Sequence, residues 1–404
     1  MGIETIWWGL SLLSLAIWMV LLIFWGQFWR ADQRLTKQVT QEPQHWPTVY
    51  AIVPARNEAD VLPMSLRSLL SQNYPGKLRV VLVDDQSTDG TAAVAESVAQ
   101  QLQKTGLLNG TLTVITTEPL PPGWSGKMWA VHQGVESVLA SEPSTQPEYL
   151  LLTDADIFHD AENLKTLTSK AVQDQLDLVS LMVLLRCQSR WERFLIPAFV
   201  FFFQKLYPFP WVNSPHRSTA AAAGGCILLR RDALVEAGGM AAIKDALIDD
   251  CALAAVIKSR SQQAPHKGRI WLGLDTKTRS LRPYDSLSTI WDMVARTAFT
   301  QLNYSTGLLA VALAGMILIY LIPPISVGVG LWSQNWPLII EGAVTWLLMA
   351  LAYWPTVSLY RLSFGWALTM PAIAVLYTLM TLDGALRHWQ GRGGAWKGRV
   401  YPAR

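Results

Sequence analysis

Long uncharged stretches near both ends of the chain enclose a region in which short apolar runs alternate with amphipathic ones. Residues 6–29 contain no charged side chain and are long enough to cross about 30 Å of hydrocarbon as a helix. Three further apolar stretches follow residue 305, at 307–332, 337–360 and 364–382. The pattern predicts an N-terminal membrane anchor over residues 1–30 and C-terminal membrane segments over 305–385.

Basic residues beside these stretches predict the orientation of an integral membrane protein. A cleaved signal peptide would need a basic start and a shorter apolar run, so a retained anchor is favoured. Arg30, Arg34 and Lys37 follow the anchor and place the next domain in the cytoplasm by the positive-inside rule. The basic tail over 386–404 also favours the cytoplasm. Three complete crossings would leave that tail outside, so one C-terminal segment is expected to be re-entrant or interfacial.

The region over residues 45–300 has the mixed pattern of an α/β domain. Buried strands are predicted at 49–53, 78–83, 112–116, 149–153 and 176–183, and helices at 59–71, 91–103 and 127–140. Strands that alternate with helices predict a mainly parallel sheet with right-handed crossovers. The aromatic segment 194–212 is interrupted by prolines and Lys205 and is predicted to be interfacial. A buried aromatic helix is the alternative.

Composition narrows the class of protein. Hydrophobic residues make up 51% of the 404 residues and charged residues only 16%, which is unlike a freely soluble enzyme. The formal net charge of +3 is too small for a nucleic-acid-binding surface, so no nucleic acid is expected as a partner. The three widely spaced cysteines lack the spacing of a zinc site or disulfide framework and are interpreted as reduced.

Carboxylates follow three of the predicted strands, where an open parallel sheet binds its ligands. Asp84 and Asp85 leave the second strand together, and such buried neighbours need donors such as a nucleobase, ribose hydroxyls or a cation. Asp154 and Asp156 follow the fourth strand, one residue apart. Hard divalent cations bind such carboxylates together with substrate phosphates. The alternative for the acids after the second strand is a turn that caps the next helix. The alternative for the acids after the fourth strand is a solvated loop.

Asp249 and Asp250 stand at the predicted start of an apolar helix. Their negative charges could stabilise the positive end of the helix dipole. Alternatively, a buried carboxylate at this position could act as a general base toward a substrate hydroxyl. Gly224 and Gly225 would let the backbone approach a ligand closely, or would allow tight packing.

Taken together, the motifs VPARNEAD, VVLVDDQSTDGT, LLLTDADIF, AAGGCILLRRDAL and LIDDCALA resemble inverting glycosyltransferases of family 2. The resemblance covers residues 49–296. The anchor, PPGWSGKMWAVHQG, IWDMVARTAFTQL, the apolar C-terminal third and AWKGRVYP are similar to the membrane-bound hopene-associated glycosyltransferases, which in turn are similar to ceramide glucosyltransferases.

The resemblance implies a GT-A fold, a nucleotide-diphosphate sugar as donor, with a UDP-sugar favoured, and Mg²⁺ or Mn²⁺ as cofactor. It implies that Pro54, Glu58 and Asp85 line the nucleoside pocket. It further implies that Asp154 lies nearer the ribose and that Asp156 is the metal ligand.

The same resemblance implies that Asp250 is the catalytic base, with Asp249 and Gly225 on the acceptor side. Lys127 and Arg296 are candidates for contacts to the diphosphate, with a role at the helix surface as the alternative for both. Of the Q-x-x-R-W motif of processive relatives only Arg296 is present, so processivity is not implied.

The leading hypothesis is an inverting glycosyltransferase that moves a sugar to the hydroxyl of a lipid acceptor, with a hopanoid suggested by resemblance alone. Ceramide-like, carotenoid and polyprenyl-phosphate lipids are the alternative acceptors. From other classes, a nucleotidyltransferase would need a basic phosphate-binding loop after the first strand, where only Arg56 is present. A non-catalytic membrane scaffold would not need the acids that the motifs retain.

Overall fold

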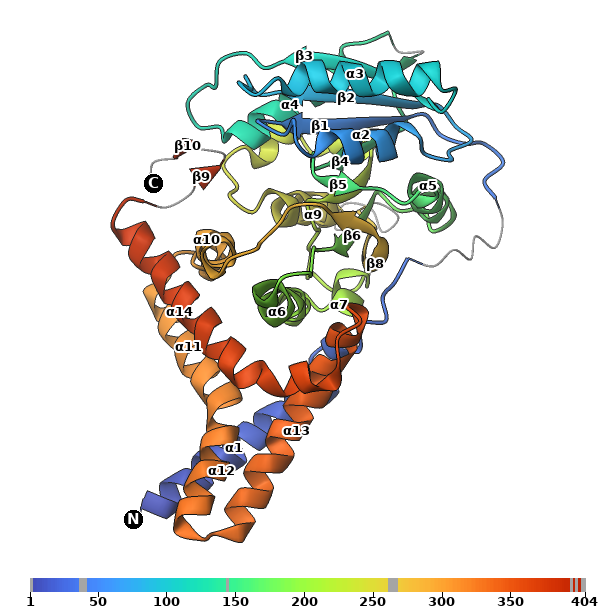
Figure 1. The fold of residues 1–404 in the computed structure, drawn as a ribbon. Helices are drawn as coiled ribbons and strands as arrows, with labels where there is room; N and C mark the ends of the chain where they lie inside the picture. The colour runs from blue at the N-terminus through green and yellow to red at the C-terminus, as the bar shows by residue number, and fades with distance from the viewer. Residues whose placement is uncertain are drawn as a thin grey trace.

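The computed structural model describes residues 3–35, 42–142, 145–260, 268–392, 395–396 and 399–400. Lys37, Lys397 and Arg404, three of the basic residues used to predict orientation, lie outside the described residues. Figure 1 shows an α/β domain from which a narrow group of helices projects toward the N-terminus.

An eight-stranded sheet forms the centre of the α/β domain, in the order β3-β2-β1-β4-β7-β6-β8-β5. Its strands are β1 (Val49–Ala55), β2 (Leu78–Asp84), β3 (Gly110–Thr116), β4 (Tyr149–Thr153), β5 (Ile157–Phe158), β6 (Leu178–Leu184), β7 (Cys226–Arg230) and β8 (Ile270–Ser280). β7 runs antiparallel to both of its neighbours, and β5 runs antiparallel to β8. The remaining strands share one direction, which confirms the predicted mainly parallel sheet.

Helices cover both faces of the sheet, and β1 is therefore buried along its whole length. They are α2 (Leu62–Leu70), α3 (Thr91–Lys104), α4 (Gly126–Leu139), α5 (Asn163–Gln173), α8 (Arg231–Glu236), η3 (Met240–Ile243) and α9 (Asp249–Ser259). Alternate residues of β1 point to opposite faces. Ala51 and Val53 pack in the core with α2, α3 and α5, whereas Ile52 packs in the core with α4.

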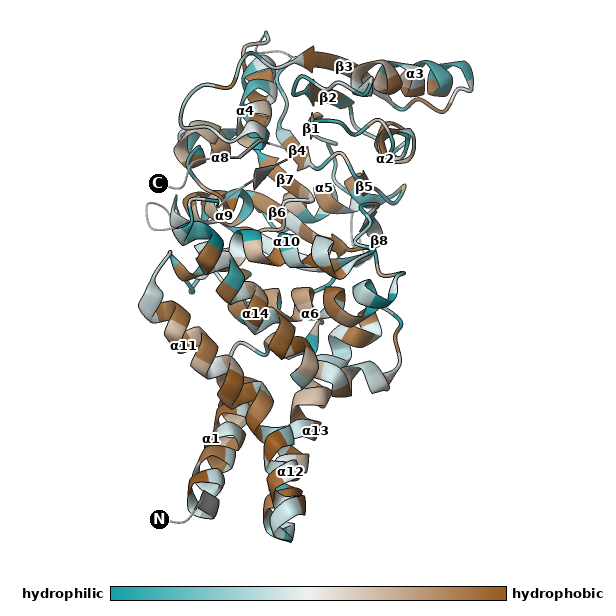
Figure 2. Cartoon of the chain, turned by 60° about the vertical axis from the view of Figure 1, so that its left-hand side comes forward, coloured by the Kyte–Doolittle hydropathy of each residue, from teal (hydrophilic) through white to brown (hydrophobic). Residues whose placement is uncertain are grey.

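The apolar helices form a second part of the structure. They comprise α1 (Ile3–Phe24), η1 (Phe28–Arg30), α11 (Thr306–Met316), η6 (Ile317–Leu321), α12 (Ile322–Ser333), α13 (Trp336–Leu359), η7 (Phe364–Thr369) and α14 (Met370–Trp389). Among the described residues, four helices are long and apolar enough to cross a membrane: Thr5–Phe24, Thr306–Ser333, Trp336–Leu359 and Phe364–Trp389. Figure 2 shows hydrophobic residues along α11, α12 and α14. The predicted apolar helices at both ends of the chain are therefore confirmed.

The helices α1, α12 and α13 pack together in the projecting part, which we call the helical stalk. The helix over 306–333 continues through the π-helical turn η6, so Pro323 and Pro324 do not interrupt it; they occupy the first turn of α12. α13 then returns to the α/β domain, while α14 runs along α10 (Leu287–Ala298) and ends near that domain (Figure 1).

The aromatic segment 194–212 lies where the two parts meet. It forms most of α6 (Arg190–Leu206), followed by α7 (Phe209–Val212), and α6 packs against α10, α13 and α14. Leu195 and Phe201 are fully buried, whereas Leu206 is 56% exposed. The segment is thus largely packed against protein, and its contact with a lipid surface stays a prediction.

The N-terminal segment that includes α1 and η1 is also joined to the α/β domain. The ring of Phe28 in η1 lies 5.4 Å from that of Phe201. Beyond η1, the backbone N–H of Leu274 in β8 donates to the carbonyl of Gln33 at 2.7 Å, and Leu35 N–H donates to the carbonyl of Leu274 at 3.2 Å. Residues 33–35 therefore add a short bridge to the edge of β8.

Gly384 allows α14 to lie directly against the backbone of α10. A Cβ atom at this position would overlap the carbonyl oxygen of Ala295. We expect Gly384→Ala to destabilise the protein by about 1–3 kcal/mol, because the backbone of α10 cannot rotate aside as a side chain can. Thermal unfolding of the detergent-solubilised chain measures the effect. Gly315→Ala in α11 is the control, because no atom lies within 4 Å of its added Cβ; equal losses in both variants would contradict the prediction.

Candidate active site

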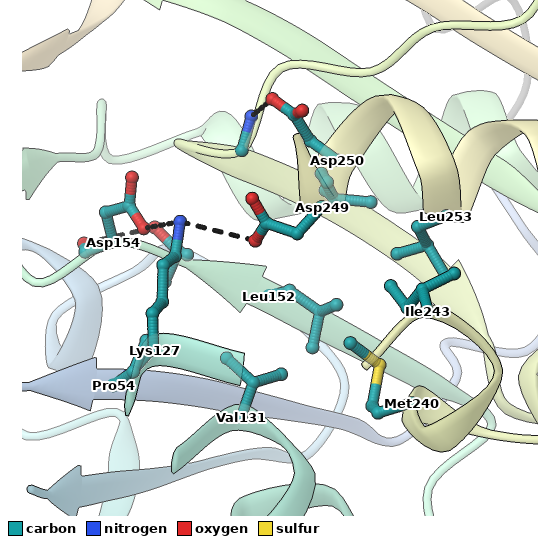
Figure 3. Close-up of a pocket in the computed structure, with 13 residues that line it drawn as sticks. Pro54, Lys127, Val131, Leu152, Asp154, Met240, Ile243, Asp249, Asp250 and Leu253 are labelled. Carbon is teal, nitrogen blue, oxygen red and sulfur yellow. Dashed lines mark hydrogen bonds and ion pairs between the residues drawn. The ribbon is translucent and has the colours of Figure 1, made fainter. Parts of the chain in front are cut away.

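The carboxyl ends of β1 and β4 and the first turns of α4 and α9 surround an open cavity of about 340 Å³. Its lining combines charged and apolar side chains: Pro54, Lys127, Val131, Leu152, Thr153, Asp154, Gly224, Ile227, Met240, Ile243, Asp249, Asp250 and Leu253. Figure 3 shows the charged groups of Lys127, Asp154 and Asp249 close together, with Met240, Ile243 and Leu253 on another side. One wall can therefore hold polar groups while the other excludes water.

Lys127 is the cation of this cavity. The side chain of Ser125 caps α4 by accepting a hydrogen bond from Met128 N–H, which fixes Lys127 in the first turn. Its Nζ lies 2.8 Å from Asp154 Oδ1 and 3.7 Å from Asp249 Oδ2. Burial alone would lower the pKa of Lys127, but the two carboxylates outweigh burial and hold it above its ordinary value. Lys127 is therefore a permanent positive charge at the cavity.

Asp250 is held by two backbone N–H groups at the start of α9. Its Oδ2 accepts from Gly224 N–H at 2.8 Å and its Oδ1 accepts from Cys251 N–H at 2.7 Å. Burial, and next the charge of Asp249, raise the pKa of Asp250 to about 6, although Lys127 and the two N–H groups oppose the shift. A carboxylate with this pKa is a base near neutral pH and accepts a proton more readily than an ordinary aspartate.

The acids at the end of β2 and in the loop that follows it have two different environments. Asp84 and Asp89 shape the loop: Asp84 accepts from Ser87 N–H, and Asp89 accepts from Ala59 N–H at 3.0 Å. For these two the helix-capping and turn interpretation holds. Asp85 differs, because it is 1% exposed and its Oδ1 accepts from Thr117 Oγ1 at 3.1 Å.

Glu58 and Asp156 meet a residue that the sequence analysis missed. Arg282 Nη2 lies 3.0 Å from Glu58 Oε1, and Arg282 Nε lies 3.4 Å from Asp156 Oδ2. Ser280 Oγ donates to the same Oδ2 at 2.7 Å. If 270–280 had been predicted as a strand, Ser280 and Arg282 would have been expected at this edge of the sheet. The second half of the strand is polar, so its full length is not evident from the sequence.

The structure brings together only some of the predicted site residues. Pro54, Lys127, Asp154, Asp249 and Asp250 line one cavity, whereas Glu58, Asp85, Asp156, Gly225 and Arg296 do not line it.

The last two of these residues are placed apart from the cavity for different reasons. The carbonyl oxygen of Gly225 accepts a hydrogen bond from Thr153 Oγ1 at 2.8 Å. A Cβ atom at Gly225 would be in tight contact with the side chains of Ile157 and Val183. Arg296 lies on the exposed side of α10. Their binding roles stay predictions.

The donor set for a metal ion is small. Within residues 3–35, 42–142, 145–260 and 268–392, no group of three or more His, Cys, Asp or Glu side chains could hold a metal ion. Asp154 and Asp156 are hard oxygen donors that fit Mg²⁺ or Mn²⁺ if further ligands come from substrate phosphates. Each of them is paired with a basic side chain in this structure.

Comparison with known proteins finds similarity over the part of the chain that carries most of this site. Residues 50–238 match the family model "Glycosyl transferase family 2", which includes Pro54, Lys127 and Asp154 but ends before Asp249 and Asp250. An N-acetylglucosaminyltransferase of Rhizobium leguminosarum bv. trifolii is 41% identical over 66 residues. Those residues are 16% of this chain and 36% of that protein, so the match spans about a third of the curated relative.

A solved glycosyltransferase structure shares the fold. The mannosyltransferase PcManGT from Pyrobaculum calidifontis, in complex with GDP-Man and Mn²⁺, is similar with a TM-score of 0.50 and 20% identity over 94% of this chain and 97% of that chain. Glucosyl-3-phosphoglycerate synthase from Mycobacterium tuberculosis matches 64% of this chain and 80% of its own, with a TM-score of 0.38 and 16% identity. The first similarity, together with the mixed sheet, confirms the expected GT-A-type fold.

Proposed function

We propose that the protein is a membrane-bound inverting glycosyltransferase that moves a sugar from a nucleotide-diphosphate sugar to a lipid hydroxyl. The observation that carries the proposal is that a carboxylate with a raised pKa, Asp250, and a cation, Lys127, line the same cavity, which borders the segment that matches the family 2 model. The base and the cation supply the two needs of the reaction: removal of a proton and stabilisation of a departing diphosphate.

In the proposed step, Asp250 accepts the proton of the acceptor hydroxyl as that oxygen attacks the anomeric carbon of the donor sugar. The bond from this carbon to the diphosphate oxygen breaks on the opposite face, so a single displacement inverts the anomeric centre. The nucleoside diphosphate leaves with the electron pair, and Lys127 stabilises its negative charge. Gly224 and Cys251 N–H fix the Asp250 carboxylate in the cavity wall.

A divalent ion fits this proposal. Asp156, with Asp154 as the second candidate, would hold Mg²⁺ or Mn²⁺, and the ion would neutralise charge that develops on the diphosphate. The Mn²⁺ and GDP-Man in the similar mannosyltransferase structure support a divalent ion and a nucleotide sugar. Glu58 follows β1 and Asp85 follows β2; both are buried and are proposed to meet the nucleoside.

The acceptor is proposed to be a lipid because the base lies next to the junction with the apolar helices. Cys251 follows Asp250, and its side chain interacts electrostatically with that of Tyr207, which belongs to the aromatic segment. Tyr207 Oη in turn donates to Gln301 Oε1 at 2.7 Å, just before α11. An acceptor that enters along this junction would bring its hydroxyl toward Asp250. A hopanoid is the first acceptor to test, followed by ceramide-like, carotenoid and polyprenyl-phosphate lipids.

The arrangement of the helices supports a specific topology. Apolar side chains such as Val311, Trp332 and Ile340 are 60–87% exposed on the apolar helices, as expected for contact with lipid. We propose that α1 and the pair formed by 306–333 and α13 cross the membrane and that α14 lies at its surface beneath the α/β domain. This leaves an even number of crossings between that domain and the basic tail, so both face the cytoplasm.

Nucleotide release tests the proposal. The purified detergent-solubilised protein is incubated with UDP- and GDP-sugars, with and without Mg²⁺ or Mn²⁺, and with hopanoid or total lipid extract. We expect release that depends on the metal and on lipid and is lost in Asp156→Ala. Lipid-stimulated release that persists in Asp156→Ala would remove Asp156 from the metal role. Donor binding by calorimetry without any release would favour the scaffold interpretation.

A further inference from the structure

Arg282 lies between two carboxylates that are almost inaccessible to solvent. Glu58 and Asp156 are 6% and 5% exposed, and the guanidinium group contacts both, at 3.0 Å and 3.4 Å. The contact joins distant parts of the chain, because the three residues follow β1, β4 and β8. Two buried carboxylates without a cation would be costly, so Arg282 supplies the charge that lets both remain ionised.

The backbone on both sides of Arg282 is fastened to the site. Leu281 N–H donates to the carbonyl of Asp156 at 2.8 Å, and Ser280 Oγ donates to its carboxylate. Two residues after Arg282, Tyr284 N–H donates to Glu192 Oε1 at 2.8 Å, and Glu192 is fully buried. These hydrogen bonds hold the loop over residues 280–284 in place, and the loop in turn positions the guanidinium group of Arg282.

This position conflicts with a metal ion at Asp156. A divalent cation would meet a guanidinium charge at the same carboxylate, and like charges in a partly buried site repel strongly. The other acid of the D-x-D motif, Asp154, is likewise paired, with Lys127. The described residues provide no set of three acidic, His or Cys ligands that could overcome this competition.

Building on the proposed function, we propose that Arg282 is the resident counter-ion of Asp156 and makes divalent-metal binding conditional on the donor. The diphosphate of the donor would be an alternative anionic partner for Arg282. Its oxygen atoms would also be further ligands for the metal. Asp156 would therefore become available as a metal ligand only when the donor is bound. Arg282 is thus a positioning residue that sets the order of binding.

Mn²⁺ binding to the full-length chain in detergent tests the proposal, with free Mn²⁺ measured by electron paramagnetic resonance in the absence and presence of UDP or GDP. We expect the unmodified chain to bind Mn²⁺ at least about tenfold more tightly with the nucleotide it prefers. Arg282→Gln should bind Mn²⁺ about tenfold more tightly than the unmodified chain without nucleotide, and the effect of nucleotide should shrink. Arg279→Gln is the matched control, because this exposed arginine of β8 lies over the ring of Phe158, away from both carboxylates.

Arg282→Lys guards against misfolding of the glutamine variant, because it keeps a charge but lacks the planar fork that reaches two carboxylates. It should give an intermediate Mn²⁺ affinity without nucleotide, and Asp156→Asn combined with Arg282→Gln should abolish the gain. Unchanged nucleotide-free affinity in both folded Arg282 variants would overturn the proposal. Failure of the proposed function would give a different result. No donor would support turnover, and nucleotide would change the Mn²⁺ affinity of no variant. Arg282→Gln would still bind Mn²⁺ more tightly than the unmodified chain without nucleotide.

Discussion

Asp250→Asn is expected to lower sugar transfer by about 10²–10⁴-fold while leaving donor binding largely intact. The reason is chemical: an amide has no basic oxygen that can hold the proton of the acceptor hydroxyl at neutral pH. The carboxylate is already positioned by Gly224 and Cys251 N–H, so no other group stands in the same place. Transfer is measured with the donor and lipid identified by nucleotide release, and donor binding by calorimetry.

The comparison needs a control for loss of one negative charge. Asp232→Asn serves, because Asp232 is an exposed residue of α8 outside the cavity, paired with its neighbour Arg231. This variant should transfer sugar at the unmodified rate. The thermal unfolding midpoint of Asp250→Asn is measured as well, since the amide leaves one of the two N–H groups without its acceptor. Unchanged transfer by a folded Asp250→Asn protein would remove Asp250 from the role of base.

Lys127→Met is expected to lower transfer by about 10²–10³-fold and to shift its pH dependence. The methionine leaves Asp154 and Asp249 without their cation and removes the positive charge proposed to stabilise the diphosphate. The sign of the pH effect follows from Asp250. Its pKa of about 6 is held down by Lys127, so without that charge the pKa rises and the active carboxylate form requires a higher pH.

A pH–rate profile between about pH 5 and about pH 9 checks this prediction. The unmodified protein should lose activity as the pH falls through about 6, and Lys127→Met should lose it at a higher pH. Lys127→Arg keeps the charge and should retain an acidic limb close to the original. Lys104→Met, at the exposed end of α3, controls for loss of a lysine elsewhere. An acidic limb that does not move in Lys127→Met would contradict the electrostatic coupling.

The sequence was sufficient to predict the architecture because each face of the sheet is buried by a helix. Uninterrupted apolar runs such as 49–53 can only be buried strands in an α/β pattern, and the structure extends this one to Ala55. The acids at strand ends were predictable for the same reason, since parallel strands deliver their carboxyl ends to one edge. Of these strand-end acids, Asp154 lines the cavity, whereas Asp85 and Asp156 do not.

Two features of the site could not be read from the sequence. Only the first five residues of β8, 270–274, form an apolar run; the second half is polar and partly exposed, so the sequence does not show that the strand continues to Ser280. Ser280 and Arg282 depend on that strand, and their pairing with Asp156 and Glu58 crosses more than a hundred positions of sequence. The helix predicted at 59–71 begins only at Leu62, with Pro63 in its first turn; the N–H groups of Glu58 and Ala59 before it donate to the side chains of Thr91, at the start of α3, and Asp89.

The bridge between residues 33–35 and β8 means that the N-terminal segment before β1 is part of the folding unit of the α/β domain. A fragment excised at the first strand would lack the backbone partners of Leu274 and the ring of Phe28 that covers Phe201. Its newly exposed strand edge would lie beside a bare aromatic surface, a combination that favours self-association. Deleting the residues before β1 is therefore a poor route to a monomeric catalytic fragment.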